Sequence, residues 1–91
     1  MSYAIRAGKR LSLKAKKERE VPVNFASFLI QNCGDVPVYF KDKDRDETAV
    51  SEKTDFALMG GETMPVVLSA KTLGLMAMED TEVCLLFVSE N

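Results

Sequence analysis

The chain has 91 residues, of which 46% are hydrophobic and 29% are charged, with a formal net charge of −2. A chain of this length forms one domain and buries only roughly 60–65% of its unfolded surface, so association with other chains would help it. No apolar run approaches the roughly 18 residues of a membrane span. The N-terminus lacks the apolar core of a secretory signal, so we expect synthesis in a cytoplasm and no membrane partner.

The charge is distributed unevenly along the chain. Residues 1–20 hold seven basic and two acidic residues, a balance of +5, whereas the remainder holds five basic and twelve acidic residues, a balance of −7. This asymmetry favours a basic segment that binds an acidic partner, although the segment could also dock on its own acidic body. The basic residues that we expect to contact a partner are Arg6, Lys9, Arg10, Lys14, Lys16, Lys17 and Arg19.

We expect residues 1–22 to form an extended N-terminal arm that carries an edge strand. Leu11 and Leu13 alternate with polar residues, which is the period of a half-buried strand, and a lysine-rich second face is typical of a sheet edge. Pro22 ends the arm because it has no N–H to donate to a central strand. We expect that deletion of residues 1–20 leaves the main domain, residues 23–91, folded but abolishes assembly.

Two apolar runs open the main domain, at residues 25–32 and 36–41. Phe28 and Ile30 point to one side of the first run, which is apolar on both faces in its middle, as in a strand that is covered by a neighbour. The intervening Asn32-Cys33-Gly34-Asp35 is a turn signal. The two runs are therefore predicted to pair as a hairpin.

The polar stretch at residues 42–55, DKDRDETAVSEKTD, predicts a mobile, solvated loop. It begins like a calcium loop, but Glu47 stands where glycine is required and Lys53 stands at the twelfth position, which is normally glutamate. We therefore expect no metal there, and no other cofactor motif occurs in the chain. Phe56 to Met59 predicts a short strand or a segment tucked into the core, and Gly60-Gly61 predicts a tight turn.

The last third of the chain holds three apolar runs, at residues 64–69, 73–78 and 83–88, separated by short polar breaks. We expect these runs to form a three-stranded meander. The side chains expected on its inner face are Leu73, Leu75, Ala77, Val83, Leu85 and Phe87. Six or seven short strands and no long helix predict an all-β fold, a small antiparallel β-sandwich or a jelly-roll-like barrel.

The sequence contains no recognisable catalytic constellation. Histidine is absent, which removes the commonest general base and the commonest metal ligand, so we expect a protein that is not an enzyme. Cys33 and Cys84 fall in different predicted strands. In a reducing compartment we expect two buried free thiols, and a bridge only if the two strands are neighbours.

Two phrases, Asn32 to Tyr39 and Phe56 to Met64, make the chain resemble small virion proteins of tailed bacteriophages. The run Leu73 to Ala77 and the acidic turn Glu79 to Val83 also resemble the sequence pattern of those proteins. The resemblance covers roughly residues 25–88. It leaves the arm unmatched. The aromatic residue that is often present in the penultimate strand of those proteins is replaced here by leucine and methionine.

The resemblance implies a β-sandwich or jelly roll without catalytic residues. Such proteins serve as capsid cement or decoration proteins, head fibres or tail parts, and are often trimeric. It therefore implies a location at the capsid surface and the major capsid protein, or another virion protein, as partner. One alternative is a small nucleic-acid-binding barrel that uses the basic arm, although the acidic body would repel a polyanion and the arm offers only Tyr3 for stacking. A third is a domain that captures a peptide on an exposed sheet edge.

Overall fold

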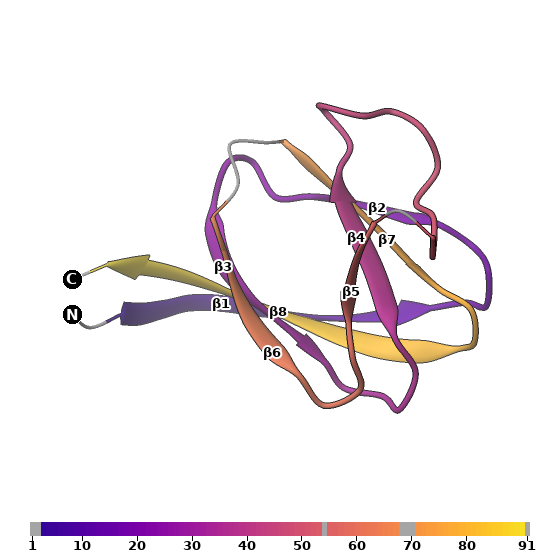
Figure 1. Cartoon of the computed structure of the whole chain (residues 1–91). Helices are drawn as coiled ribbons and strands as arrows, with labels where there is room; N and C mark the ends of the chain where they lie inside the picture. The colour runs from indigo at the N-terminus through magenta and orange to yellow at the C-terminus, as the bar shows by residue number, and fades with distance from the viewer. Residues whose placement is uncertain (1–2, 54, 68–70, 91) are drawn as a thin grey trace.

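The computed structural model describes residues 3–53, 55–67 and 71–90, which form eight β-strands (Figure 1). No described segment forms a helix of the length and apolarity that a membrane crossing requires. The strands are β1 (Tyr3–Leu13), β2 (Arg19–Pro22), β3 (Ser27–Asn32), β4 (Val38–Asp42), β5 (Phe56–Leu58), β6 (Thr63–Val67), β7 (Thr72–Ala77) and β8 (Thr81–Glu90).

The strands form two four-stranded antiparallel sheets that pack face to face. Sheet A has the order β1-β8-β3-β6, and sheet B has the order β2-β7-β4-β5. The chain passes from one sheet to the other at each connection except the β4–β5 hairpin. The predicted all-β fold is confirmed: of the two expected architectures, a β-sandwich or a jelly-roll-like barrel, the described residues form an antiparallel sandwich, with eight strands instead of six or seven.

The predicted local pairings are wrong. β3 pairs with β6 and β8, while β4 pairs with β5 and β7, so the Asn32 to Asp35 turn carries the chain between the two sheets and does not close a hairpin. The predicted meander is also absent, because β7 lies in sheet B whereas β6 and β8 lie in sheet A. Apart from the β4–β5 hairpin, each pairing joins strands that are not consecutive in the chain, because crossing between sheets buries two apolar faces against each other.

The core lies between the sheets and is built by alternation along the strands. Five of the six side chains predicted for the inner face are fully buried, and Phe87 is partly buried with its ring 5.7 Å from that of Phe28. Leu73 and Leu75 of sheet B share the core with Val83 and Leu85 of sheet A. The sequence therefore predicts the correct inner faces, although these faces belong to opposite sheets.

The N-terminal segment supplies an edge strand to each sheet. β1 pairs with β8 from Tyr3 to Leu13, and β2 pairs with β7. Leu11, Leu13 and Val21 are buried in the core. The structure thus leads to the opposite expectation for a deletion of residues 1–20, because it would remove core side chains and uncover β8. The outer ends of β1 and β8, where Tyr3 lies opposite Glu90, project together beyond the other strands (Figure 1).

A buried asparagine joins the two phrases that carry the virion resemblance. The side-chain nitrogen of Asn32 donates to the carbonyl oxygens of Val36 at 2.7 Å and Leu58 at 2.9 Å, and its side-chain oxygen accepts the N–H of Gly34 at 3.0 Å. A Cβ on Gly60 would lie 2.8 Å from the Gly34 carbonyl oxygen, so only glycine permits this close approach. These motif residues therefore hold two turns together.

Candidate interaction surfaces

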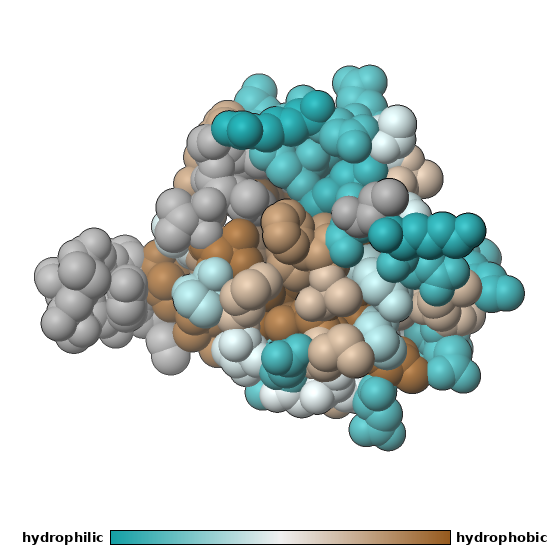
Figure 2. Space-filling model, in the orientation of Figure 1, coloured by the Kyte–Doolittle hydropathy of each residue, from teal (hydrophilic) through white to brown (hydrophobic). Residues whose placement is uncertain are grey.

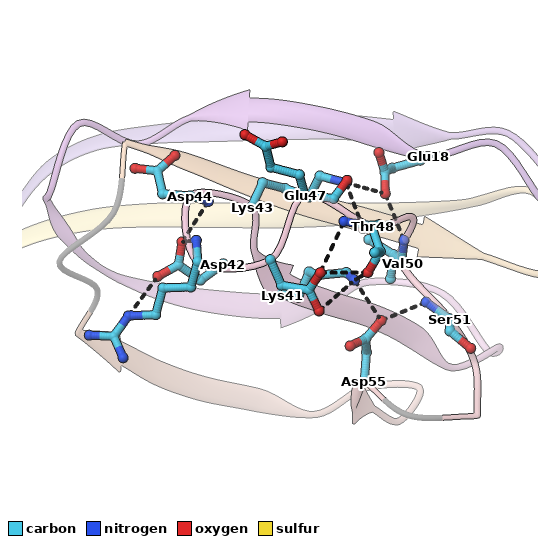
Figure 3. A network of polar contacts seen from close by, with 12 residues as sticks. Glu18, Lys41, Asp42, Lys43, Asp44, Glu47, Thr48, Val50, Ser51 and Asp55 are labelled. Carbon is cyan, nitrogen blue, oxygen red and sulfur yellow. Dashed lines mark hydrogen bonds and ion pairs between the residues drawn. The ribbon is translucent and has the colours of Figure 1, made fainter.

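Two buried lysines attach the loop of residues 43–55 to the outer side of sheet B (Figure 3). The side chains of Lys41 and Lys43 are each only 8% exposed. Lys41 Nζ donates to Thr48 Oγ1 at 2.9 Å and lies 3.5 and 3.7 Å from carboxylate oxygens of Asp46 and Asp55. A charge buried in this way requires partners, and the loop supplies them.

Lys43 connects the same loop to the segment that precedes β2. Its Nζ donates to the carbonyl oxygens of Glu47 at 3.0 Å and Thr48 at 2.8 Å, and to Glu18 Oε1 at 3.2 Å. The same Glu18 oxygen accepts the backbone N–H of Val50 at 2.7 Å. The Glu18 carboxylate and the Lys43 ammonium therefore hold each other in place. Together they also fix the loop at Glu47, Thr48 and Val50.

The loop packs directly on β7. A Cβ on Gly74 would lie 2.7 Å from Cδ of Lys43 and 3.0 Å from Cγ2 of Val50, so the absence of a side chain at Gly74 makes room for the lysine stem. Val50 is buried. The prediction of a solvated loop is therefore wrong for Lys43 and Val50, because the two apolar stems cover the outer side of β7.

The acidic residues of this loop act as local hydrogen-bond acceptors. Asp42 accepts the backbone N–H of Asp44 at 2.9 Å, and Asp44 accepts that of Lys71 at 2.7 Å. Asp46 accepts both the hydroxyl and the N–H of Thr48, and these hydrogen bonds, with Lys41 nearby, hold its pKa below the usual value. Within the described residues no group of acidic, cysteine or histidine side chains is arranged to hold a metal ion.

The basic residues predicted to bind a partner are dispersed along the first two strands and their connection. Arg10 pairs with Glu82 at 3.1 Å and Lys14 with Asp80 at 3.9 Å, while Arg19 donates to the Ser12 carbonyl oxygen. Lys9, Lys16 and Lys17 are exposed, and the side chain of Arg6 lies outside the described ones. Part of the basic segment thus meets the acidic body of its own chain.

On the outer face of sheet A, apolar residues form a row across all four strands, and no described segment covers this row. Leu86 of β8 lies directly opposite Gly8 of β1 and Leu29 of β3, and Leu29 lies opposite Pro65 of β6. Gly8 and Pro65 are exposed and both leucines are partly exposed. We call Gly8, Leu86, Leu29 and Pro65 the apolar row. Exposed apolar residues that lie side by side mark a surface to which a partner protein could bind.

An apolar groove of about 320 Å³ opens between β5 and β6, where the two sheets are not joined. Figure 2 shows apolar residues gathered over this part of the molecule, with hydrophilic residues above and to the right. Phe56 is 74% exposed and stacks on Phe40 with ring centroids 5.9 Å apart. The residues that line the groove are Phe40, Lys41, Asp42, Phe56, Met64, Pro65, Val66 and Leu73.

The cysteines are placed differently from the prediction. Cys33 is exposed and Cys84 is only half-buried, so the two thiols are not core groups. Both face the outer side of sheet A, in the neighbouring β3 and β8 region. Partial desolvation of the sulfur and the nearby Cys84 thiol raise the pKa of the Cys33 thiol, and the charge of Arg10 opposes this rise.

Comparison with known proteins supports the fold. The structure is similar to the solution NMR structure of a de novo designed double-stranded β-helix, with a TM-score of 0.56 and 20% sequence identity over 92% of this chain and 100% of the designed chain. No protein-family model and no curated protein matches the sequence. The similarity concerns the fold alone, and the resemblance to virion proteins stays a prediction.

Proposed function

We propose that the protein is a non-enzymatic structural subunit of a virion, of the capsid cement or decoration type. In this role it binds the shell built by the major capsid protein and works as a homo-oligomer, with a trimer as the favoured form. The observation that carries the proposal is the apolar row on the uncovered face of sheet A. A patch with an apolar centre and a polar rim is the usual composition of a protein–protein interface.

The distribution of polar groups supports a binding role. The most buried charged groups, Lys41 and Lys43, are bonded to the loop and serve to hold it in place. The space between the sheets is filled by aliphatic and aromatic side chains. A sandwich that presents an apolar row on one outer face suits a protein that stabilises the joints of a larger shell.

The ion pairs of the basic segment argue against the alternative function, nucleic-acid binding. Arg10 and Lys14, two of the cations that would contact phosphates, face Glu82 and Asp80. Those carboxylates would repel a polyanion at the same place. Size-exclusion chromatography with light scattering, recorded at protein and nucleic-acid wavelengths, separates the two: a nucleic-acid complex that dissociates in high salt would overturn the shell proposal.

The direct test is incorporation into particles. We expect mass spectrometry to find the chain in purified virus particles assembled with its gene present, and Leu86→Lys to reduce its occupancy at least tenfold. Ser12→Lys is the matched control, because it adds the same charge to the same sheet face outside the apolar row. Absence of the wild-type chain from particles, or equal loss in both variants, would contradict the proposal.

A further inference from the structure

The two cysteines are neighbours on the outer face of sheet A although they lie far apart in the sequence. Cys84 of β8 is directly opposite Gln31 of β3. Cys33, two positions after Gln31, donates its backbone N–H to the carbonyl oxygen of Glu82 at 3.0 Å. This register makes the two cysteines diagonal neighbours on one face, within reach of each other's side chains.

A cation lies beside the pair. Arg10 of β1 is opposite Cys84 on its other side, and its guanidinium also pairs with Glu82 at 3.1 Å. Desolvation and the nearby Cys84 thiol raise the pKa of the Cys33 thiol, whereas the positive charge of Arg10 opposes this rise and favours the thiolate, which is the nucleophilic form. Cys33 is exposed, so a dissolved reagent can reach it.

Cys33 lies just beyond the regular part of β3. It follows directly after Asn32, the last residue of that strand, and its backbone N–H donates to Glu82 of β8. A disulfide requires Cβ atoms about 3.5–4.5 Å apart, closer than most diagonal pairs in a regular sheet. A residue just beyond a strand end can make that adjustment with a small change of its backbone.

We propose that Cys33 and Cys84 form a dithiol site that a small disulfide oxidises to an intramolecular disulfide, joining β3 to β8. The reaction breaks two S–H bonds of the protein and the S–S bond of the oxidant, for example oxidised glutathione, and forms one S–S bond between the cysteines. The oxidant accepts two electrons and two protons and leaves as two thiols. The inference is independent of the proposed function.

The disulfide would lock the two central strands of sheet A. It closes a loop that runs from β3 through both sheets to β8, and long closed loops restrict the unfolded chain most. In a reducing cytoplasm the site stays open, whereas an oxidising exterior closes it. The protein would thus become more resistant to unfolding after it leaves the compartment in which it is made.

The test is titration of the purified chain with oxidised glutathione, followed by mass spectrometry without reductant. We expect a monomer that has lost two hydrogen atoms and whose Tm rises by roughly 10 °C, with both changes reversed by a dithiol reductant. Cys33→Ser and Cys84→Ser should each retain one glutathione adduct and show no such rise. Closure should accelerate with rising pH, because the Cys33 thiol must ionise.

Arg10→Gln tests the electrostatic part of the site. It should slow closure several-fold near neutral pH while leaving the same final product, because the neutral amide no longer opposes the rise in the pKa of the Cys33 thiol. Two glutathione adducts on one wild-type chain, a disulfide-linked dimer, or a wild-type chain that remains fully reduced would each overturn the proposal. Any of these would show that the two sulfurs do not reach one another.

Discussion

The outer faces of the two sheets differ in what covers them. Sheet B carries the loop of residues 43–55, fixed by two buried lysines and seated over the bare backbone of Gly74. Sheet A has no described segment over it, and it exposes the apolar row and the cysteine pair. The two buried lysines therefore close the outer face of sheet B, whereas the described residues leave the outer face of sheet A accessible.

This difference shows how one sandwich can separate stability from binding. Buried ammonium groups are stabilising only while every partner is in place, so the covered face of sheet B should be sensitive to substitution. Side chains on the open face of sheet A have few neighbours, so substitutions on that face should change the free energy of unfolding only slightly. The following predictions test this contrast, beginning with the largest effect.

Deletion of residues 1–20 should prevent folding. It removes Leu11 and Leu13 from the core and leaves β8 without its partner, and burial of each leucine contributes about 1.5–3 kcal/mol in a domain whose total stability is about 5–15 kcal/mol. Loss of dispersed amide signals in an NMR spectrum would show it. A truncated chain with the native spectrum would mean that β1 is a dispensable arm.

Lys43→Met should lower the free energy of unfolding by about 3 kcal/mol. The methionine fills the space of the stem but leaves the Glu18 carboxylate and the two loop carbonyl oxygens without their donor. Urea denaturation measures the change. Lys53→Met is the matched control, since this exposed lysine of the same loop should change stability by less than about 0.5 kcal/mol. Equal effects would show that the lysine is not an anchor.

The two strand glycines offer a direct comparison of the two sheets. Gly74→Ala should cost about 1–2 kcal/mol, because its Cβ would lie 2.7 Å from the Lys43 stem under the loop. Gly8→Ala should be neutral or slightly stabilising, because its Cβ would lie 3.4 Å from Leu86, an ordinary contact on an open face. Thermal unfolding of both variants measures the difference, and the reverse order would refute the contrast between the faces.

The smallest predicted effect is the acid sensitivity of the loop. The hydrogen bonds from Thr48 lower the pKa of Asp46 in the folded protein, so their contribution to stability is complete above the unfolded pKa of about 3.9. That contribution is lost as the pH falls through the folded pKa. The difference in stability between Asp46→Asn and the wild type should therefore begin to shrink as the pH falls below about 4 and should vanish only below the folded pKa, which urea titrations at several pH values would reveal. If the difference in stability between the variant and the wild type did not change with pH, the acid sensitivity would belong to another group.

Much of the sandwich follows from the sequence. Period-two alternation identified most of the strands, and it placed Leu73, Leu75, Val83 and Leu85 on inner faces, because burial on one side of a pleated strand leaves a local mark. The candidate interaction surfaces are harder to predict from the sequence. Leu29 is apolar in the same way whether its face is covered or open, and Lys41 and Lys43 are indistinguishable from solvated lysines in a polar stretch. The relation between Cys33 and Cys84 depends on which strands are neighbours.

Strand pairing was decided only by the tertiary structure. Turn residues such as Asn32 to Asp35 indicate that the chain reverses, but not whether it returns to the same sheet or crosses to the other one. The crossing is favoured because two apolar faces must be buried against each other, a condition of the whole chain that no single segment expresses. The sequence by itself thus determined the strands and their inner sides, whereas the packing of one sheet on the other determined the partners of each strand, the covered face and the open one.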